Sequence, residues 1–523
     1  MKTVNVLTLG VGSTLLLSCG AGAKKQEAKE QVPQKPNVVF LIADDIGYGD
    51  LSCYGEKTIH TPNVDRLASM GIRFTDAHTV AATSTPSRYS LFTGHDSWRR
   101  SDTGIARGDA GMIIKPNQIT IADMFKKAGY ITGGIGKWHL GLGEKAGTQN
   151  WNEKVSPGPE DIGFDYSFLM AATGDRVPCV WMHNQRVHCY DPSAPITVSY
   201  PKPIAGEPTG KDNPELLTKL KPSHGHDQSI VNGISRIGHM KGGGKALWMD
   251  ENIADTITTK AIQFINDHKD KPFFLYVGTN DIHVPRYPHG RFVGKSGMGK
   301  RGDAILEFDW TVGEIIKTLE ANGLMENTVF VLSSDNGPVI DDGYQDQAEE
   351  KLGNHRPWGD FRGGKYSNFE AGTRVPLLFC WQAKVKPGVS SALVSQVDLY
   401  ASMANLLGQK IEEGAAPDSQ DMLKAFMGED TKGREYVLES ASSLSVSDGE
   451  WKYITPNDKP AINKQTKTEY GNSPEDQLYN LKKDVGEKNN VAAEYPEVVA
   501  RLKAIIAKEE AKEPKQIVEK KKK

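Results

Sequence analysis

The chain has 523 residues, of which 38% are hydrophobic and 25% charged, so it can build one large domain and a smaller one, each with its own core. Its 66 acidic and 63 basic residues leave a formal net charge of -3. This balance excludes a basic protein that is drawn to nucleic acid by its overall field, so any recognition of anions must be local.

The N-terminus has the pattern of an export signal. Residues 1–18 contain one lysine and an apolar stretch that is too short, and too interrupted by glycine, to span a bilayer as a stable helix. The stretch leads to Leu-Leu-Ser-Cys, which resembles a bacterial lipobox with Cys19 as the lipidated, mature N-terminus; an ordinary cleaved signal with an incidental cysteine is the alternative. Residues 19–35 then form a polar tether, and we expect an exported lipoprotein with a lipid anchor, in the periplasm or at the outer membrane.

Three apolar runs predict strands that are buried on both faces of a sheet. They cover residues 37–42, 273–278 and 328–332. Each run is followed by polar residues, which are Asp44 and Asp45, then Thr279, Asn280 and Asp281, then Ser333, Ser334, Asp335 and Asn336. In open α/β sheets ligands bind at the carboxyl ends of the strands, where these side chains are expected.

Amphipathic helices are predicted between these runs, because apolar residues recur every three to four positions over 253–265 and 305–319. Strands that alternate with helices favour an α/β fold with a large, mostly parallel sheet sandwiched by helices. Short strand-like pieces at 433–438 and 451–454 predict a smaller C-terminal α+β domain. We therefore divide the chain into a catalytic domain at 36–410, an α+β subdomain at 411–510 and a lysine-rich tail at 511–523.

Two further features are a long irregular segment and the four cysteines other than Cys19. The segment 142–250 is rich in Gly, Pro, Asn and Trp and has little periodicity, which is typical of functional loops or lids. In an exported protein Cys179 and Cys189 are candidates to close a hairpin-like loop, but the sequence does not fix the pairing. With Cys53 and Cys380, they are expected to be structural and not catalytic.

The most informative segment is Ser84-Thr85-Pro86-Ser87-Arg88. It resembles the signature of the formylglycine-dependent sulfatases, in which a Cys or Ser followed by x-Pro-Ser-Arg is oxidised after translation to formylglycine (3-oxoalanine). Further blocks follow in the family's order, at 37–45, 61–68, 136–141, 283–285, 334–337, 364–365, 372–376 and 478–491. By this resemblance the chain is identified as an arylsulfatase-like sulfatase of the alkaline-phosphatase-like superfamily, similar to carbohydrate sulfatases of the Ser type from anaerobic gut bacteria.

Hard oxygen ligands at two strand ends indicate a metal site. Asp44, Asp45, Asp335 and Asn336 have no cysteine or paired-histidine cluster beside them, which favours Ca²⁺ or Mg²⁺ over zinc. A single aspartate is more often a helix cap or turn residue, but two pairs at adjacent strand ends favour the metal. The resemblance implies that the ion is calcium and that the oxidised Ser84 also contacts it.

Oxidation of Ser84 has a chemical reason. A serine that attacked sulfur would leave a sulfated enzyme whose release needs a second attack at a crowded, anionic sulfur. A hydrated aldehyde has two hydroxyls, of which one attacks sulfur and the other later expels sulfate, so the second step of covalent catalysis becomes easier. Ser rather than Cys implies, by resemblance, an oxygen-independent anaerobic maturating enzyme as a partner; an engineered replacement of a native cysteine is the alternative.

The resemblance also implies roles for basic residues around the sulfate group. Arg88 holds the formylglycine and its metal side, and Lys137 and Lys365 grip sulfate oxygens. His139 takes the proton of the hydrated aldehyde during sulfate release. His283, with Lys365, protonates or stabilises the leaving alcohol.

The substrate is expected to be a sulfated glycan. Trp-rich loops suit a surface pocket for the terminal sugar of a host glycan, and galactose or N-acetylgalactosamine is favoured. Asp175 and Arg176 are candidates for contact with the substrate, and Thr173 is a weaker one. Two alternatives stay open: a phosphoester hydrolase of the same superfamily that uses unmodified Ser84, and a glycan-binding lipoprotein that has lost catalysis.

Overall fold

The computed structural model describes residues 35–512. The expected signal peptide, Cys19, the tether up to residue 34 and the tail from residue 513 lie outside the described residues. Within 35–512, no helix is both long and apolar enough to cross a membrane.

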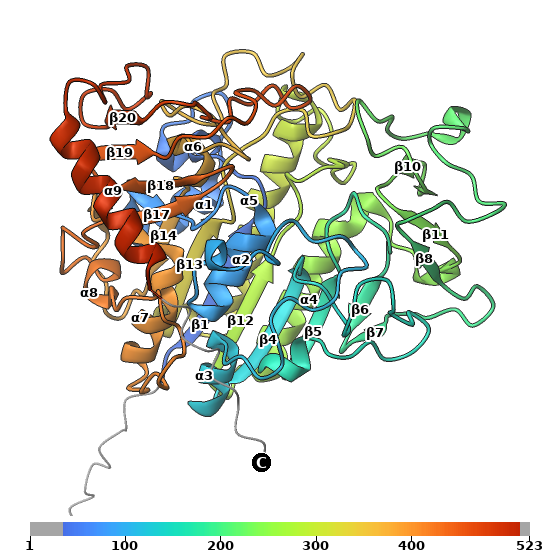
Figure 1. Ribbon diagram of the computed structural model, residues 1–523. Coiled ribbons are helices and arrows are strands. Elements are labelled where there is room, and N and C mark those ends of the chain that lie inside the picture. The colour runs from blue at the N-terminus through green and yellow to red at the C-terminus, as the bar shows by residue number, and fades with distance from the viewer. Residues whose placement is uncertain (1–34, 513–523) are drawn as a thin grey trace, which may run out of the picture. The chain divides into compact units, whose positions relative to one another are not determined.

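A ten-stranded sheet forms the centre of the molecule (Figure 1), with the order β15-β2-β14-β13-β1-β12-β4-β5-β6-β7. From β13 to β5 all neighbours are parallel, whereas β14, β6 and β7 add antiparallel pairs. The strands are β1 (Asn37–Ala43), β2 (Gly71–Phe74), β4 (Ile131–Lys137), β5 (Tyr166–Met170), β6 (Trp181–His183), β7 (Arg186–Val187), β12 (Phe273–Gly278), β13 (Thr328–Ser334), β14 (Leu377–Cys380) and β15 (Gly388–Ser390). The predicted parallel sheet is confirmed at its centre, and the whole sheet is mixed.

Helices cover both faces of this sheet. Phe273 and Phe274 are consecutive in β12 and therefore point to opposite faces; Phe273 contacts Phe264 of α4, whereas Phe274 stacks on Phe125 of α3. The helices are α1 (Pro62–Ser69), α2 (Ser84–Thr93), α3 (Ile121–Lys127), α4 (Ile253–His268), α5 (Gly299–Ala321), α6 (Glu370–Thr373), α7 (Leu399–Leu406), α8 (Leu423–Phe426) and α9 (Pro496–Glu510). The predicted helices at 253–265 and 305–319 correspond to α4 and α5, and the predicted sandwich is confirmed.

A second, antiparallel sheet lies near the C-terminus. Its strands are β17 (Val437–Ser440), β18 (Leu444–Ser447), β19 (Trp451–Ile454) and β20 (Gln477–Asn480), and α9 crosses them in Figure 1. Leu502 and Ile506 of α9 pack with Val446 and Leu478 in a separate small core. This is the expected α+β unit, but its first strand starts later than the predicted 433, because Gly433 has a φ of 72° and pairs with Leu393 in an isolated bridge instead.

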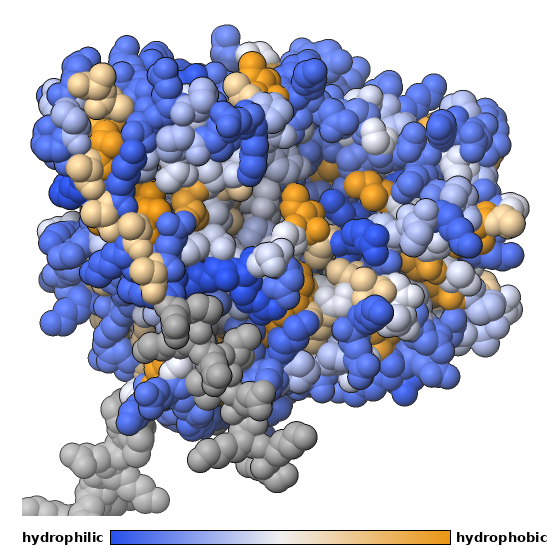
Figure 2. Space-filling model, in the orientation of Figure 1, coloured by the Kyte–Doolittle hydropathy of each residue, from blue (hydrophilic) through white to orange (hydrophobic). Residues whose placement is uncertain are grey.

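The irregular segment 142–250 holds short paired strands, shown in green at the right of Figure 1. Besides β5 to β7 they are β8 (Thr197–Ser199), β9 (Ile230–Val231), β10 (Ile234–Ser235) and β11 (His239–Lys241); elsewhere β3 (Ala77–His78) pairs with β16 (Val394–Ser395). Cys179 is buried and Cys189 exposed, and both are free thiols, so the disulfide considered for them is not formed. The face drawn in Figure 2 is largely hydrophilic, with small, scattered hydrophobic patches.

Candidate active site

The carboxyl ends of four adjacent parallel strands bring the predicted site residues together. Asp44 and Asp45 follow β1, Asp335 follows β13, and Lys137 ends β4. His283 lies in the loop after β12, which pairs with both β1 and β4. Because parallel strands end at the same edge of a sheet, residues far apart in sequence meet there, and all five side chains are buried.

Ser84 is the first residue of α2, so its side chain lies at a helix N-terminus. Its Oγ atom lies 2.5 Å from Nζ of Lys137 and 3.5 Å from Oδ1 of Asp44, and it also donates to Asp335. The helix dipole and the ammonium group both favour negative charge at this position. An oxygen nucleophile attached here is therefore stabilised in its anionic form.

Arg88 lies one helical turn after Ser84 and fixes Asp335. Its Nε and Nη2 atoms donate to Oδ2 of Asp335 at 3.0 and 2.7 Å, and Nη1 contacts the hydroxyl of Tyr276. Burial raises the pKa of Asp335, but Arg88 and Lys137 outweigh this effect and hold that pKa below its usual range. The role of Arg88 on the metal side of the site stays a prediction.

The carboxylate cluster has oxygen atoms to spare for a cation. Oδ2 of Asp44 and Oδ1 of Asn336 are buried and lack a hydrogen-bond partner, while Nδ2 of Asn336 donates to Asp45 at 2.7 Å. Burial raises the pKa of Asp44 to about 8, although Lys137 lowers it. The neighbouring carboxylates of Asp335 and Asp45 raise this pKa further. A carboxylate this costly to ionise is one that a cation would stabilise, so the donor set fits a metal ion.

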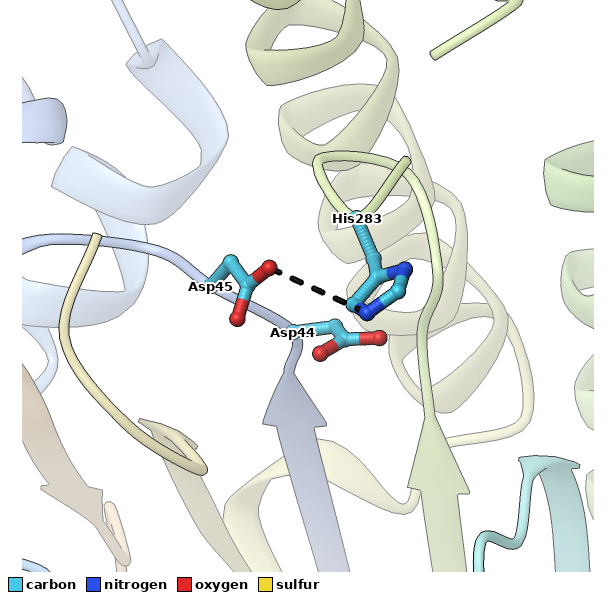
Figure 3. Close-up of side chains that lie close together, drawn as sticks. All are labelled: Asp44, Asp45 and His283. Carbon is cyan, nitrogen blue, oxygen red and sulfur yellow. Dashed lines mark ion pairs between the residues drawn. The ribbon is translucent and has the colours of Figure 1, made fainter. Parts of the chain in front are cut away.

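His283 faces this cluster from the loop after β12 (Figure 3). Its Nε2 lies 4.0 Å from Oδ2 of Asp45, and its Nδ1 donates to the carbonyl of Val284 at 2.7 Å. One ligand atom each from Asp44, Asp45 and His283 lie within 4.8 Å of one another, so His283 adjoins the metal position as well as the pocket. Burial, with Lys365 and Lys137, lowers the pKa of His283 to about 4.

His139 has one ring nitrogen committed and one free. Nε2 donates to the carbonyl of Ala106 at 2.9 Å, so Nδ1 carries the lone pair, and this atom is buried without a hydrogen-bond partner. Burial and the neighbouring Lys137 lower the pKa of His139 well below 6.5. A neutral imidazole with an unused lone pair beside Ser84 is suited to accept a proton.

Lys365 connects the carboxylate cluster to the wall of a pocket. Its Nζ lies 2.8 Å from Oδ2 of Asp45 and 2.8 Å from Oδ2 of Asp342, whose carboxylate also accepts from the hydroxyl of Tyr366. Burial disfavours the ammonium ion, but Asp342 and Asp45 outweigh it and raise the pKa of Lys365 well above its usual value. Lys365 therefore stays charged.

A cavity of about 500 Å³ opens above Ser84. Of the predicted residues, it is lined by Ser84, His139, Asp175, Arg176, His283 and Lys365. Lys137 and Arg88 lie beneath it, fully buried. Thr173 does not line it; its hydroxyl accepts from Nη1 of Arg176 at 2.8 Å and so positions that side chain.

Sequence reasoning missed several residues of this cavity. The Nε2 atom of His226 donates to Oδ2 of Asp175 at 2.9 Å. Burial disfavours the charged form of this ring, but Asp175 outweighs burial and raises the pKa of His226. The other missed lining residues include His224, Gln228, Asp342, Tyr366, Asn463, Gln465, Thr466 and Tyr470. The run His224-Gly225-His226 in a polar loop was a usable signal, but residues 463–470 belong to the C-terminal unit and reach the site only through the fold.

This arrangement defines a class of protein: an enzyme with an α/β sheet that hydrolyses anionic esters, with a nucleophile at a helix N-terminus, an oxygen-rich cation position and cations around the pocket. Comparison with known proteins narrows the class. The sulfatase family model matches residues 36–409, and the chain belongs to that family. Members of the family generally use a metal ion and formylglycine, and the predicted enzyme class, a sulfuric ester hydrolase, is confirmed.

Individual relatives agree with this assignment. The chain is 54% identical over 509 residues to an N-acetylgalactosamine-6-O-sulfatase of Bacteroides thetaiotaomicron, covering 97% of this chain and 99% of the relative. Human arylsulfatase A is 28% identical over 524 residues, covering 95% of this chain and 90% of the relative. The comparisons do not favour the phosphoester hydrolase or the non-catalytic lipoprotein.

Solved structures show the same fold. One structure, which was solved for work on the metabolism of multiple glycosaminoglycans by Bacteroides thetaiotaomicron, is 54% identical to this chain. It superposes with a TM-score of 0.90 and covers 92% of this chain and 100% of that one. A sulfatase structure from Pseudoalteromonas sp. superposes with a TM-score of 0.67 at 21% identity, covering 93% and 91%, and shows the fold alone.

Proposed function

We propose that this chain is a calcium-dependent carbohydrate sulfatase that removes the 6-O-sulfate of terminal N-acetylgalactosamine, with galactose 6-sulfate as the related substrate, using an oxidised Ser84. The observation that carries the proposal is the 54% identity to an N-acetylgalactosamine-6-O-sulfatase over 97% of the chain. The cluster of Ser84, Asp44 and Lys137 at the base of a sugar-sized cavity supports it.

Asp44, Asp45, Asp335 and Asn336 would hold the calcium ion. Four oxygen donors suit a hard cation, and the two unpartnered oxygens on Asp44 and Asn336 supply unused lone pairs. When bound, calcium supplies a positive charge that orients the nucleophile and the sulfate oxygens. The chain itself contributes two cations that partly neutralise these carboxylates. Lys137 pairs with Asp44, and Arg88 pairs with Asp335.

Formylglycine at position 84 would supply, in its hydrated form, the hydroxyl that attacks sulfur and a second hydroxyl for sulfate release. Lys137 Nζ, at 2.5 Å from the Ser84 oxygen, stabilises the anionic form of this nucleophile. The free Nδ1 of His139 accepts the proton that must leave before sulfate is expelled. Both groups are held rigidly, because Lys137 ends a buried strand and His139 is anchored on Ala106.

Departure of the sugar hydroxyl is assigned to His283 and Lys365, which line the pocket next to the carboxylate cluster. His283 is neutral near pH 7 in the free chain, since its pKa is about 4. A bound sulfate group favours the protonated ring, and Lys365 stabilises the oxygen as negative charge develops on it.

Asp175, Arg176 and His226 form the recognition wall for the sugar. Arg176 Nη1 lies 2.9 Å from Oδ1 of Asp175, and His226 Nε2 lies 2.9 Å from Oδ2 of the same carboxylate. The three side chains therefore hold one another in place. Burial opposes ionisation of Asp175, but Arg176 and His226 outweigh it and hold its pKa well below the usual value. A charged acceptor beside charged donors suits hydrogen bonding to sugar hydroxyls.

The cellular setting completes the proposal. An anaerobic maturating enzyme would oxidise Ser84 before folding, because this side chain is almost fully buried in the fold. Lipidation at Cys19 would anchor the chain in the periplasm or at the outer membrane, where sulfated glycans arrive.

A panel of sulfated monosaccharides tests the substrate. The chain, produced together with an anaerobic maturating enzyme, is expected to release sulfate from N-acetylgalactosamine 6-sulfate and galactose 6-sulfate. It is expected to be inactive on the 4-sulfated and 2-sulfated isomers. The sulfate must lie at Ser84 while the sugar hydroxyls contact the wall of Asp175 and Arg176, and only one sulfated position allows both. Preference for another position would overturn the substrate assignment but not the family.

A further inference from the structure

Two carboxylates hold the ammonium group of Lys365 at the edge of the active-site cavity. Its Nζ atom donates to Oδ2 of Asp45 and to Oδ2 of Asp342, each at 2.8 Å. An ammonium group has three N–H donors, so these two contacts set the direction of the remaining donor. Because Lys365 is buried and lines the cavity above Ser84, that donor is placed to meet a group bound in the cavity.

The two carboxylates differ in what else they bind. Asp45 belongs to the cluster of oxygen ligands that suits a metal ion, so its charge is shared with the metal in the loaded enzyme. Asp342 lies outside that cluster, and its Oδ1 atom accepts from the hydroxyl of Tyr366 at 3.0 Å. Asp342 is therefore the counter-ion that Lys365 does not share with the metal.

The loop 338–346, which carries Asp342, is fixed to the loop that carries His283. Arg286 follows His283 closely in the chain and is fully buried. Its guanidinium group donates to the carbonyl of Ile340 at 2.7 Å and to two further oxygen atoms of the loop 338–346. A guanidinium with several buried acceptors holds both loops rigidly, so Asp342 has a fixed position relative to His283.

We infer that Asp342 is a positioning residue for Lys365, which it orients so that the remaining N–H meets the oxygen atom on which charge develops as the sugar departs. The inference rests on the proposed function, because Lys365 is taken there to stabilise this leaving oxygen. Asp342 acts through Lys365 and not on the sulfate group, since a carboxylate repels an anion at short range. A cation that is already oriented needs no reorganisation in the transition state.

Asp342→Asn tests this inference, because it keeps the size of the side chain and an oxygen acceptor but removes the charge. In the oxidised enzyme it is expected to lower kcat on the sugar sulfate about tenfold to hundredfold, and kcat on an activated aryl sulfate less than about threefold. Asp341→Asn is the matched control, since Asp341 accepts from Ser223 at 2.7 Å and lies outside the lining of the cavity. It should keep native rates on both substrates, and equal losses of Asp342→Asn on both would overturn the inference.

A double-mutant cycle separates action through Lys365 from a contact between Asp342 and the sugar. Lys365→Ala should lose at least as much activity on the sugar sulfate as Asp342→Asn, and the double variant should lose no more than Lys365→Ala alone. Tyr366→Phe removes only the hydroxyl that Asp342 accepts, so it should cost about twofold to fivefold and add nothing to Asp342→Asn. Losses that multiply in the double variants would show that Asp342 acts independently and would overturn the inference.

Binding to unoxidised protein in the presence of calcium is a readout that does not depend on turnover. In calorimetry, Asp342→Asn is expected to bind unsulfated N-acetylgalactosamine with the native Kd, and a weaker Kd would contradict the inference because it shows a direct contact with the sugar. A native enzyme that releases no sulfate from N-acetylgalactosamine 6-sulfate would instead contradict the proposed function. The cycle is then measured with the sulfated sugar that the native enzyme does hydrolyse.

Discussion

The Nζ atom of Lys137 lies 2.5 Å from the Oγ atom of Ser84, at the end of a buried strand. The same ammonium group lies 2.6 Å from Oδ1 of Asp44, so it serves both the nucleophile and the carboxylate cluster. Burial lowers the pKa of Lys137, and this effect outweighs Asp44 and Asp335, which act to raise it. These contacts place Lys137 between the Ser84 oxygen and the carboxylate cluster, and we propose that it takes part in the chemistry.

Replacement of Lys137 tests this relationship. Lys137→Ala is expected to lower kcat/KM by about 10²–10³, because a preorganised cation at the developing charge is lost. Lys127→Ala is the control, since that lysine is on α3 with its side chain 61% exposed. Both variants are compared by sulfate release, with the Ser84 oxidation state checked by peptide mass; native turnover in fully oxidised Lys137→Ala would refute the role.

Calcium removal should lower both activity and thermal stability. EGTA is expected to abolish turnover, and calcium, but not magnesium, to restore it. At a calcium concentration 100 times the Kd, binding stabilises the folded chain by about 2.7 kcal/mol, visible as a higher Tm even in unoxidised protein. Asp335→Asn should lose this Tm shift, whereas Asp270→Asn, an exposed position after α4, should keep it. A metal-free chain with full turnover would show that the site is wrongly assigned.

The two histidines should differ in their dependence on the leaving group. His283→Ala is expected to cost about 10²–10⁴-fold on a sugar sulfate and far less on an activated aryl sulfate, whose phenolate departs with little help. His139→Ala should slow both substrates after the alcohol has left, which gives a burst of alcohol followed by slow turnover. Equal losses of His283→Ala on both substrates, with no burst for His139→Ala, contradict this division.

A buried ion network gives a prediction for stability. His78 lies 2.6 Å from Glu439 and 2.9 Å from Asp76; burial disfavours its charged ring, but these carboxylates outweigh burial and raise its pKa from 6.5 to about 9. A raised pKa means that the stabilisation is complete below pH 6.5 and is lost as the pH rises through about 9. The loss amounts to about 3 kcal/mol at most.

Urea unfolding at pH 6.5 and pH 9.5 measures this loss. His78→Gln is expected to be less stable than the native chain at pH 6.5 and to show a smaller change between the two pH values. His60→Gln, at an exposed position, is the control and should follow the native chain. If His78→Gln kept the full pH dependence, the titrating group would have to be another one.

Local patterns were enough to predict the framework of this fold. The strands β1, β12 and β13 are continuous apolar runs, and α4 and α5 have clear helical periodicity, so sequence and structure agree there. The acids after β1 and β13 were predicted to meet because parallel strands share an edge. Antiparallel β14 and β6 carry no local mark of their direction, which explains why the sheet is more mixed than predicted.

The pocket walls were less predictable, because they depend on contacts between distant segments. Lys365 contacts Asp45, which lies 320 positions away, and Asp342 holds the same ammonium group although no motif marked it. Tyr470 comes from the C-terminal unit and lines the cavity above Ser84. Motifs identified the reacting groups, whereas the groups that surround the sugar follow only from the three-dimensional arrangement.

The most direct test of the account is the sulfatase activity on N-acetylgalactosamine 6-sulfate as a function of the oxidised fraction at position 84. Preparations made with different amounts of an anaerobic maturating enzyme are analysed by peptide mass spectrometry, in which formylglycine lacks two hydrogen atoms relative to serine. The account predicts that sulfate release rises in proportion to the oxidised fraction and vanishes when Ser84 is unmodified. Full activity in protein whose Ser84 is entirely unmodified would contradict it.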